Sequence, residues 1–247
     1  MEDRHWWFRS RRRVIWALIH RAQPKRSPRI LDAGCGTGRN LMDFQKLGPA
    51  EGVDVSKEAI EFCQRRGLHG VREAPIEQLP YEDGRFDLMF ATDVIEHLPD
   101  DGPALTELRR VASPDAALII TVPAYGWLWS QHDTSWHHYR RYTRKLLRER
   151  VVAHGWEPTV ASYFYSTMLP PVAVVRTLQR FRSNGNGKSD LHLSPGALDR
   201  WLELPVRGEA RLIERGASLP AGVSLGMVCR SSRWSPPPRR RSGGMWR

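Results

Sequence analysis

The sequence predicts an α/β fold around a doubly wound, mostly parallel sheet. Short apolar stretches with strand character alternate with stretches of helical spacing between residues 29 and 165. The first of these strands runs directly into three closely spaced glycines, a turn that brings the backbone close to a ligand. With 247 residues, the chain is long enough for one large domain or for a domain with a cap.

The expected elements follow one another in a regular order. Strands are predicted at 29–34, 50–56, from Phe86 onward, and at 116–126, 157–165 and 223–231. Helices are predicted at 39–48, 57–67, 106–112 and 143–155. Ser56 and Thr143 stand where each would cap the helix that follows. No internal repeat interrupts the alternation.

The chain divides into five expected parts. They are an N-terminal lid helix at 1–27, a core at 28–165, a helical cap at 166–222 with a flexible linker at 182–190, a final core strand at 223–231, and a disordered basic tail at 232–247. The most apolar stretch, 163–175, is too short to span a bilayer. Three cysteines without metal-ligand spacing favour a reduced, cytoplasmic setting.

The positive charge is concentrated in three segments. Residues 1–13 carry a net +3, and residues 137–150 and 231–247 carry +5 each, out of +11 for the whole chain. The remainder is therefore slightly acidic. This distribution favours local recognition of an anion and disfavours a broad nucleic-acid surface.

The first helix combines an apolar face with a central arginine. Its face is formed by Trp7, Phe8, Val14, Ile15, Leu18 and Ile19, with Trp6 to the side. Arg11 in the middle of this face needs an anionic partner, such as a ligand carboxylate or Asp32. We expect the helix to close over a ligand. A helix packed on the sheet edge, with Arg11 reaching solvent, is the alternative.

The glycine loop "LDAGCGTGRN" indicates what the ligand is. Asp32 stands two residues before Gly34, where a phosphate site would avoid negative charge, so a cationic ligand fits better. Asp54 ends the next strand and can accept from both hydroxyls of a ribose. No Lys-Ser/Thr pair follows the loop, which argues against a nucleotide triphosphatase. These acids favour S-adenosylmethionine over NAD.

Residues 29–123 resemble the catalytic core of class I S-adenosylmethionine-dependent methyltransferases. The resemblance lies in "LDAGCGTG", "GVDVS", "LPYEDGRFDLMFATDVIEHLPD" and "LIITVP", in that order and spacing. The segments "HWWFRSRRRVI" and "HHYRRYT" also resemble a bacterial subset of that superfamily that methylates small molecules, including natural products. The resemblance implies a seven-stranded, Rossmann-like sheet.

The resemblance also implies a set of cofactor-binding residues. They are Gly34, Cys35, Gly36 and Gly38 in the loop, Asp54 at the ribose, Ile76 and Glu77 beside the adenine, and Thr92 and Asp93 under the methionine. Val55 beside Asp54, and Asp32 and Arg11 as charged partners, complete the expected cofactor contacts. Pro75 stands where many relatives have an acid for the adenine amine. Backbone groups of Ile76 or the Glu77 carboxylate are expected to take its place.

The acceptor is expected beyond the carboxyl ends of the strands. Candidate bases there are His97, His132, His137 and His138. Candidate acceptor contacts are Trp7, Tyr125, Trp129, Tyr139, Arg140, Arg141 and Tyr142. No metal site is expected, because histidines in a loop such as His132 and His137, with Asp133 between them, are more often not ligands. A solvated basic helix without a role in binding is the plain alternative for residues 137–150.

The sequence thus predicts a methyltransferase acting on a small or medium-sized acceptor, partly apolar or lipid-like and anionic, with O-methylation favoured. A peptide- or RNA-directed methyltransferase and a non-catalytic cofactor-binding partner subunit are the alternatives. The apolar cap leaves weak association with a membrane surface and a homodimer open.

Overall fold

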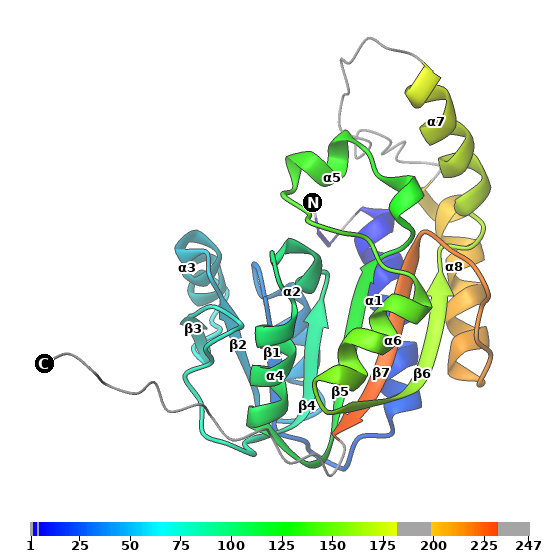
Figure 1. The fold of residues 1–247 in the computed structure, drawn as a ribbon. Coiled ribbons are helices and arrows are strands. Elements are labelled where there is room, and N and C mark those ends of the chain that lie inside the picture. The colour runs from blue at the N-terminus through cyan, green and yellow to red at the C-terminus, as the bar shows by residue number, and fades with distance from the viewer. Residues whose placement is uncertain (1, 4, 182–198, 232–247) are drawn as a thin grey trace, which may run out of the picture.

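A seven-stranded sheet forms the centre of the computed structural model, which describes residues 2–3, 5–181 and 199–231 (Figure 1). The strand order is β3-β2-β1-β4-β5-β7-β6. The strands are β1 (Ile30–Ala33), β2 (Ala50–Asp54), β3 (Val71–Glu73), β4 (Phe86–Thr92), β5 (Ala112–Pro123), β6 (Trp156–Phe164) and β7 (Ser224–Ser231). The expected linker at 182–190 and tail at 232–247 lie outside the described residues.

The predicted mostly parallel sheet is confirmed. Strands β1 to β5 pair in parallel, whereas β7 lies antiparallel between β5 and β6. The sequence analysis did not locate β3, because this strand has only three residues and only Val71 among them is buried. A strand of that length carries no recognisable periodicity.

Helices cover both faces of the sheet, as a doubly wound fold requires (Figure 1). They are α1 (Trp6–Ala22), α2 (Arg39–Phe44), α3 (Lys57–Arg65), α4 (Gly102–Val111), α5 (Gln131–Ser135), α6 (Arg144–Ala153), α7 (Leu169–Phe181) and α8 (Asp199–Glu214), with short 3-10 helices η1 (Ile95–His97) and η2 (Gly126–Leu128). Every residue of β4 is buried. Its alternate side chains supply two cores, Met89 packing with α4 and α6, and Phe90 packing with α1 and α8.

Helix α1 is packed along the sheet rather than suspended above it. It contacts β5, β7 and α8, and Val14, Ile15, Leu18 and Ile19 are buried as predicted. Trp6, expected at the side of the helix, is also buried. The amino end of α1 nevertheless reaches the carboxyl edge of the sheet (Figure 1).

The helical cap lies beside α1 and the last strands. Helix α8 packs against α1 and β6, and its Val206, Ala210 and Ile213 belong to the same core as Leu18. Both expected helix caps form: Ser56 accepts from the Ala59 amide and Thr143 from the Leu146 amide. Within the described part of the chain, no helix is both long and apolar enough to cross a bilayer.

Candidate active site

The glycine loop between β1 and α2 depends on backbone angles that glycine tolerates. Gly34, Gly36 and Gly38 have φ values of 79°, 53° and 78°. A Cβ atom on Gly34 would lie 2.4 Å from Cγ2 of Val94, so the loop packs tightly there. A Cβ atom on Gly36 would meet nothing within 4 Å. The backbone at Gly36 is therefore open to a ligand.

Asp54 at the end of β2 holds this loop in place. Its Oδ2 accepts from the Gly36 amide at 2.8 Å, and its Oδ1 accepts from the Ser56 amide at 2.9 Å. Each carboxylate oxygen can accept a further hydrogen bond. The arrangement positions a carboxylate beside the open part of the loop and leaves it able to bind ligand hydroxyls.

Asp32 on β1 is a buried carboxylate without a partner. Its side chain is 1% exposed, and neither oxygen makes a hydrogen bond within the described structure. Burial, together with the nearby charge of Asp54, raises the pKa of Asp32 to about 8. A positively charged ligand at this point would relieve the cost of burying the anion. Asp32 therefore fits the cationic ligand that the sequence predicts.

Arg11 joins α1 to the end of β4. Its Nη1 lies 2.5 Å from Oδ2 of Asp93, and its Nη2 lies 3.4 Å from the Thr121 hydroxyl. Thr121 in turn donates to Asp93 at 2.9 Å. The partner of Arg11 is thus a core acid, but Asp93 rather than the suggested Asp32. Thr92, next to Asp93, is buried at the end of the strand.

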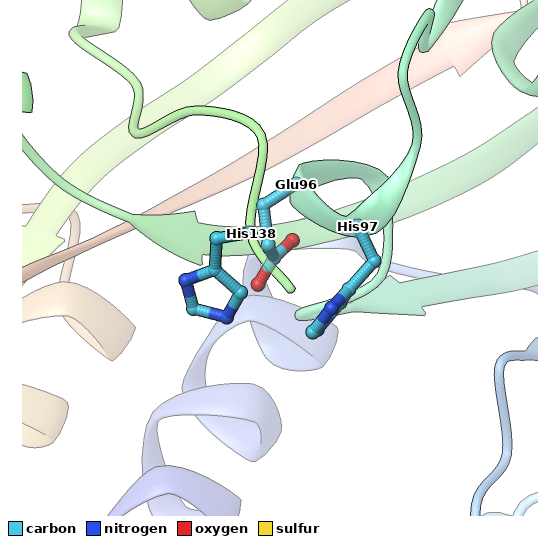
Figure 2. A group of neighbouring side chains, drawn as sticks. All are labelled: Glu96, His97 and His138. Atoms are coloured by element: carbon cyan, nitrogen blue, oxygen red, sulfur yellow. The ribbon is translucent and has the colours of Figure 1, made fainter. Parts of the chain in front are cut away.

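Three ligand-type side chains meet beyond β4. Glu96, His97 and His138 each place one ligand atom within 4.8 Å of the others, with the Glu96 carboxylate between the two imidazole rings (Figure 2). Glu96 is fully buried and neither carboxylate oxygen has a hydrogen-bond partner in the described structure. Burial and the charge of Asp93 raise the pKa of Glu96. Burial and the neighbouring His138 lower the pKa of His97, which favours its neutral form.

Asp133 organises the segment after β5. It pairs with Arg141 at 2.7 and 3.0 Å, accepts from the Ser130 amide at 2.8 Å, and lies 2.9 Å from Nδ1 of His138. These partners hold the pKa of Asp133 well below its usual range despite burial. The ligand set of His132, Asp133 and His137 that the sequence suggested does not assemble, because Asp133 is engaged with Arg141 and His137 is exposed.

Several predicted acceptor contacts are instead structural. Tyr142 is fully buried and its hydroxyl donates to Asp101 at 2.7 Å, so it is not placed to touch an acceptor. Arg141 is committed to Asp133, and Arg140 pairs with Asp101. The expected anion-binding arginines are therefore neutralised within the protein.

The remaining predicted acceptor contacts stay accessible. Tyr139 and His137 are exposed, whereas Trp7, Tyr125, Trp129 and His132 are partly buried. Tyr125 stacks on Tyr163, with ring centroids 5.0 Å apart, and burial raises its pKa to about 12. Of these residues, His132 lies beside His138 of the cluster, with ring centroids 6.5 Å apart.

The other predicted cofactor residues differ in exposure. Ile76 is buried, Glu77 is exposed, and the Val55 side chain is 69% exposed. Cys35 is buried, and burial strongly raises the pKa of its thiol. All three cysteines are free and buried.

Two contacts at the site had no signal in the sequence. The Glu2 carboxylate accepts from the Thr37 hydroxyl of the glycine loop at 2.6 and 2.7 Å. Trp7 stacks on Tyr165 with ring centroids 4.1 Å apart, and the Tyr165 hydroxyl donates to the Trp7 carbonyl. Both join the N-terminal segment to residues far along the chain, so no local pattern predicts them.

Residues 31–120, which carry the glycine loop, Asp54 and the Glu96–His97 turn, match the family described as a methyltransferase domain. This segment of the chain is thus a methyltransferase domain. Its sheet order and loop confirm the predicted resemblance and the Rossmann-like fold.

The methyltransferase domain has relatives of several kinds. A malonyl-[acyl-carrier protein] O-methyltransferase from Pseudescherichia vulneris is 30% identical over 158 residues, covering 59% of this chain and 63% of the relative. The structure of a methyltransferase bound to the Trm112 activator of Haloferax volcanii superimposes with a TM-score of 0.60 at 16% identity, covering 94% and 92% of the two chains. Geranyl diphosphate C-methyltransferase from Streptomyces coelicolor has a TM-score of 0.57 at 16% identity, covering 88% and 79%.

The chain spans less than two thirds of the length of the two curated relatives that it matches over the most residues. It covers 56% of one and 63% of the other. Named relatives include O-, N- and C-methyltransferases, so their acceptors differ. The residues of this methyltransferase domain fit S-adenosylmethionine, since a buried unpartnered acid and an open glycine loop face the same edge of the sheet.

Proposed function

We propose that the chain transfers a methyl group from S-adenosylmethionine to a hydroxyl group of a small, partly apolar molecule. The observation that carries the proposal is the buried, unpartnered Asp32 carboxylate beside the glycine loop. A buried anion without a partner is costly unless a cation reaches it. S-adenosylmethionine carries a sulfonium and an ammonium group, and it meets this requirement where a dinucleotide would not.

The cofactor would lie along the carboxyl edge of β1, β2 and β4. In this arrangement the Gly36 backbone contacts the cofactor, and Asp54 accepts from the ribose hydroxyls. Asp93 and Thr92 lie under the methionine part. Ile76 offers an apolar surface to the adenine. Arg11, held by Asp93, is positioned to meet the methionine carboxylate, so α1 would contribute directly to binding.

The acceptor would lie over the segment after β4 and β5. A hydroxyl must lose its proton before or during methyl transfer, and His97 and His138 place imidazoles at that position. Methyl transfer from a sulfonium is otherwise an in-line displacement, so the protein mainly aligns the two partners and excludes water. Because Arg140 and Arg141 are paired with acids, the proposal does not require an anionic acceptor.

The alternative of an RNA-directed enzyme receives less support. Arginines of the two described basic segments pair with acids of the same chain: Arg9 with Glu203, Arg11 with Asp93, and Arg150 with Asp101. Such pairing removes the positive field that nucleic-acid binding depends on. A role as a cofactor-binding partner subunit would leave the cluster of Glu96, His97 and His138 without a purpose.

Isothermal titration with S-adenosylhomocysteine, the product of methyl transfer, tests the proposal. The full chain should bind it, and Asp54→Asn should weaken binding by about 1.5–3 kcal/mol through loss of charged hydrogen bonds. Asp115→Asn removes an exposed carboxylate at the other end of the sheet and serves as the matched control. A folded protein that binds no S-adenosylhomocysteine would refute the proposal.

A further inference from the structure

Glu96, His97 and His138 form a set of side chains in which the Glu96 carboxylate has no partner among the described residues. The set joins η1 to the segment after α5, and its ligand atoms lie within 4.8 Å of one another (Figure 2). The Glu96 carboxylate is fully buried, is aimed into the set, and accepts no hydrogen bond in the described structure. A buried carboxylate between two imidazoles is an arrangement that a bound cation would satisfy.

The hydrogen bonds around the two imidazoles favour metal binding. Nδ1 of His138 lies 2.9 Å from Oδ1 of Asp133, whose pairing with Arg141 keeps it ionised. Nδ1 therefore donates, and in the neutral imidazole Nε2 keeps a free lone pair. His97 lies beside the Trp136 backbone, a second polar neighbour of the set. Carboxylates and carbonyls behind histidines orient them in the same way at metal centres.

The backbone holds the set together before any ion arrives. The Tyr139 amide, next to His138, donates to the Glu96 carbonyl at 2.7 Å. This bond fixes the distance between the two segments that supply the side chains. The set is therefore preorganised, which reduces the ordering cost of binding.

We propose that Glu96, His97 and His138 bind a divalent transition-metal ion of the zinc, cobalt or manganese class. Two imidazoles and one carboxylate suit such ions and leave coordination positions open for another ligand. This departs from the sequence-based expectation of no metal. No local sequence pattern indicates this set, because His138 lies 41 positions after His97.

The position of the ion suggests a role, which rests on the proposed function. An acceptor hydroxyl bound to the ion would lose its proton to solvent and become a metal-bound alkoxide or phenolate. That oxygen then forms a bond to the methyl carbon as the carbon–sulfur bond of S-adenosylmethionine breaks, and the neutral thioether leaves. With the ion bound, His97 and His138 would act as metal ligands, and the ion would take over the activation of the hydroxyl that the imidazoles provide in the metal-free site.

Metal binding is measured on the full chain without cofactor or acceptor. The protein is dialysed against chelator and titrated with Zn²⁺ by calorimetry, while Co²⁺ is followed through its visible absorption. We expect one site, with His138→Ala and Glu96→Gln each weakening it by more than about 100-fold. His137→Ala removes the exposed neighbouring histidine and should leave binding unchanged.

Glu96→Gln also separates loss of a ligand from loss of the fold. Because the Glu96 carboxylate is buried without a partner, the neutral amide of the same shape should leave the melting temperature of the metal-free protein equal or higher. Absence of a stoichiometric site in the folded wild-type chain overturns the metal proposal. Equal binding by wild type, His138→Ala and Glu96→Gln also overturns it.

The metal site and the proposed function can fail separately. A chain that binds S-adenosylhomocysteine but no metal loses only the metal site. A chain that binds one metal ion through these residues but no S-adenosylhomocysteine keeps the site and loses the methyltransferase activity.

Discussion

The guanidinium of Arg11 on α1 lies 2.5 Å from the carboxylate of Asp93 at the end of β4. The two residues are 82 positions apart, and their pairing places the first helix of the chain at the proposed methionine end of the cofactor. Helix α1 is at once a packed element of the core and a contributor to the site. This dual position defines how its role as a lid can be tested.

Arg11→Ala should weaken binding of S-adenosylhomocysteine by about 1–3 kcal/mol, since a charged hydrogen bond to the ligand, or the orientation of Asp93, is lost. Calorimetric titration measures this change directly. Arg13→Ala on the same helix, where the arginine is exposed and faces Glu203, is the control that should bind normally. Unchanged affinity of Arg11→Ala together with a lower melting temperature would reduce α1 to a packing element.

Because of Asp32, the free energy of unfolding of the ligand-free protein should fall as the pH rises. The pKa of Asp32 is about 8 in the folded chain and about 3.9 in an unfolded one, so the folded state binds the extra proton between these values. Its contribution to the free energy of unfolding is complete below about pH 4 and is lost as the pH rises through 8.

Melting temperatures of the wild type and Asp32→Asn between pH 5 and pH 8.5 measure this contribution. The wild type should lose up to about 1.4 kcal/mol per pH unit relative to the variant, which does not titrate. Parallel curves for the two proteins would show that Asp32 remains ionised and that a partner neutralises it.

Arg141 should matter for stability rather than for acceptor binding. It pairs with Asp133, whose side chain is fully buried, while the Arg141 side chain is 6% exposed. Arg141→Leu would leave a buried charge with fewer partners and should lower the free energy of unfolding by about 3–5 kcal/mol. Chemical denaturation measures the loss.

Arg148→Leu, which removes an exposed arginine from α6, should change the unfolding free energy by less than about 0.5 kcal/mol. If the Arg141 variant is as stable as this control but fails to bind or methylate an acceptor, the sequence-based assignment of Arg141 to the acceptor would be restored.

Local patterns explain why the sequence predicted the sheet, the glycine loop and Asp54. Strand alternation, a Gly34–Gly36–Gly38 turn and a helix cap at Ser56 each depend on residues close together in the chain. The weaker predictions involve long-range contacts. Tyr142 reads as an exposed aromatic in a polar segment, yet the fold buries it against Asp101. Strand β3 was not predicted, because three residues are too few to show the alternation of a strand.

The sequence by itself determined the fold class, the cofactor loop and the class of chemistry, because these follow from periodicity and from short motifs. Only the tertiary structure decided which charges are free. Asp93 and Asp101 are neutralised by arginines distant in sequence and Asp133 by Arg141 eight positions on, whereas Asp32 and Glu96 are buried without partners among the described residues. All five are carboxylates, and amino-acid composition does not distinguish them. Whether an acid supports the fold or awaits a ligand depends on the partners that folding brings within a few ångströms.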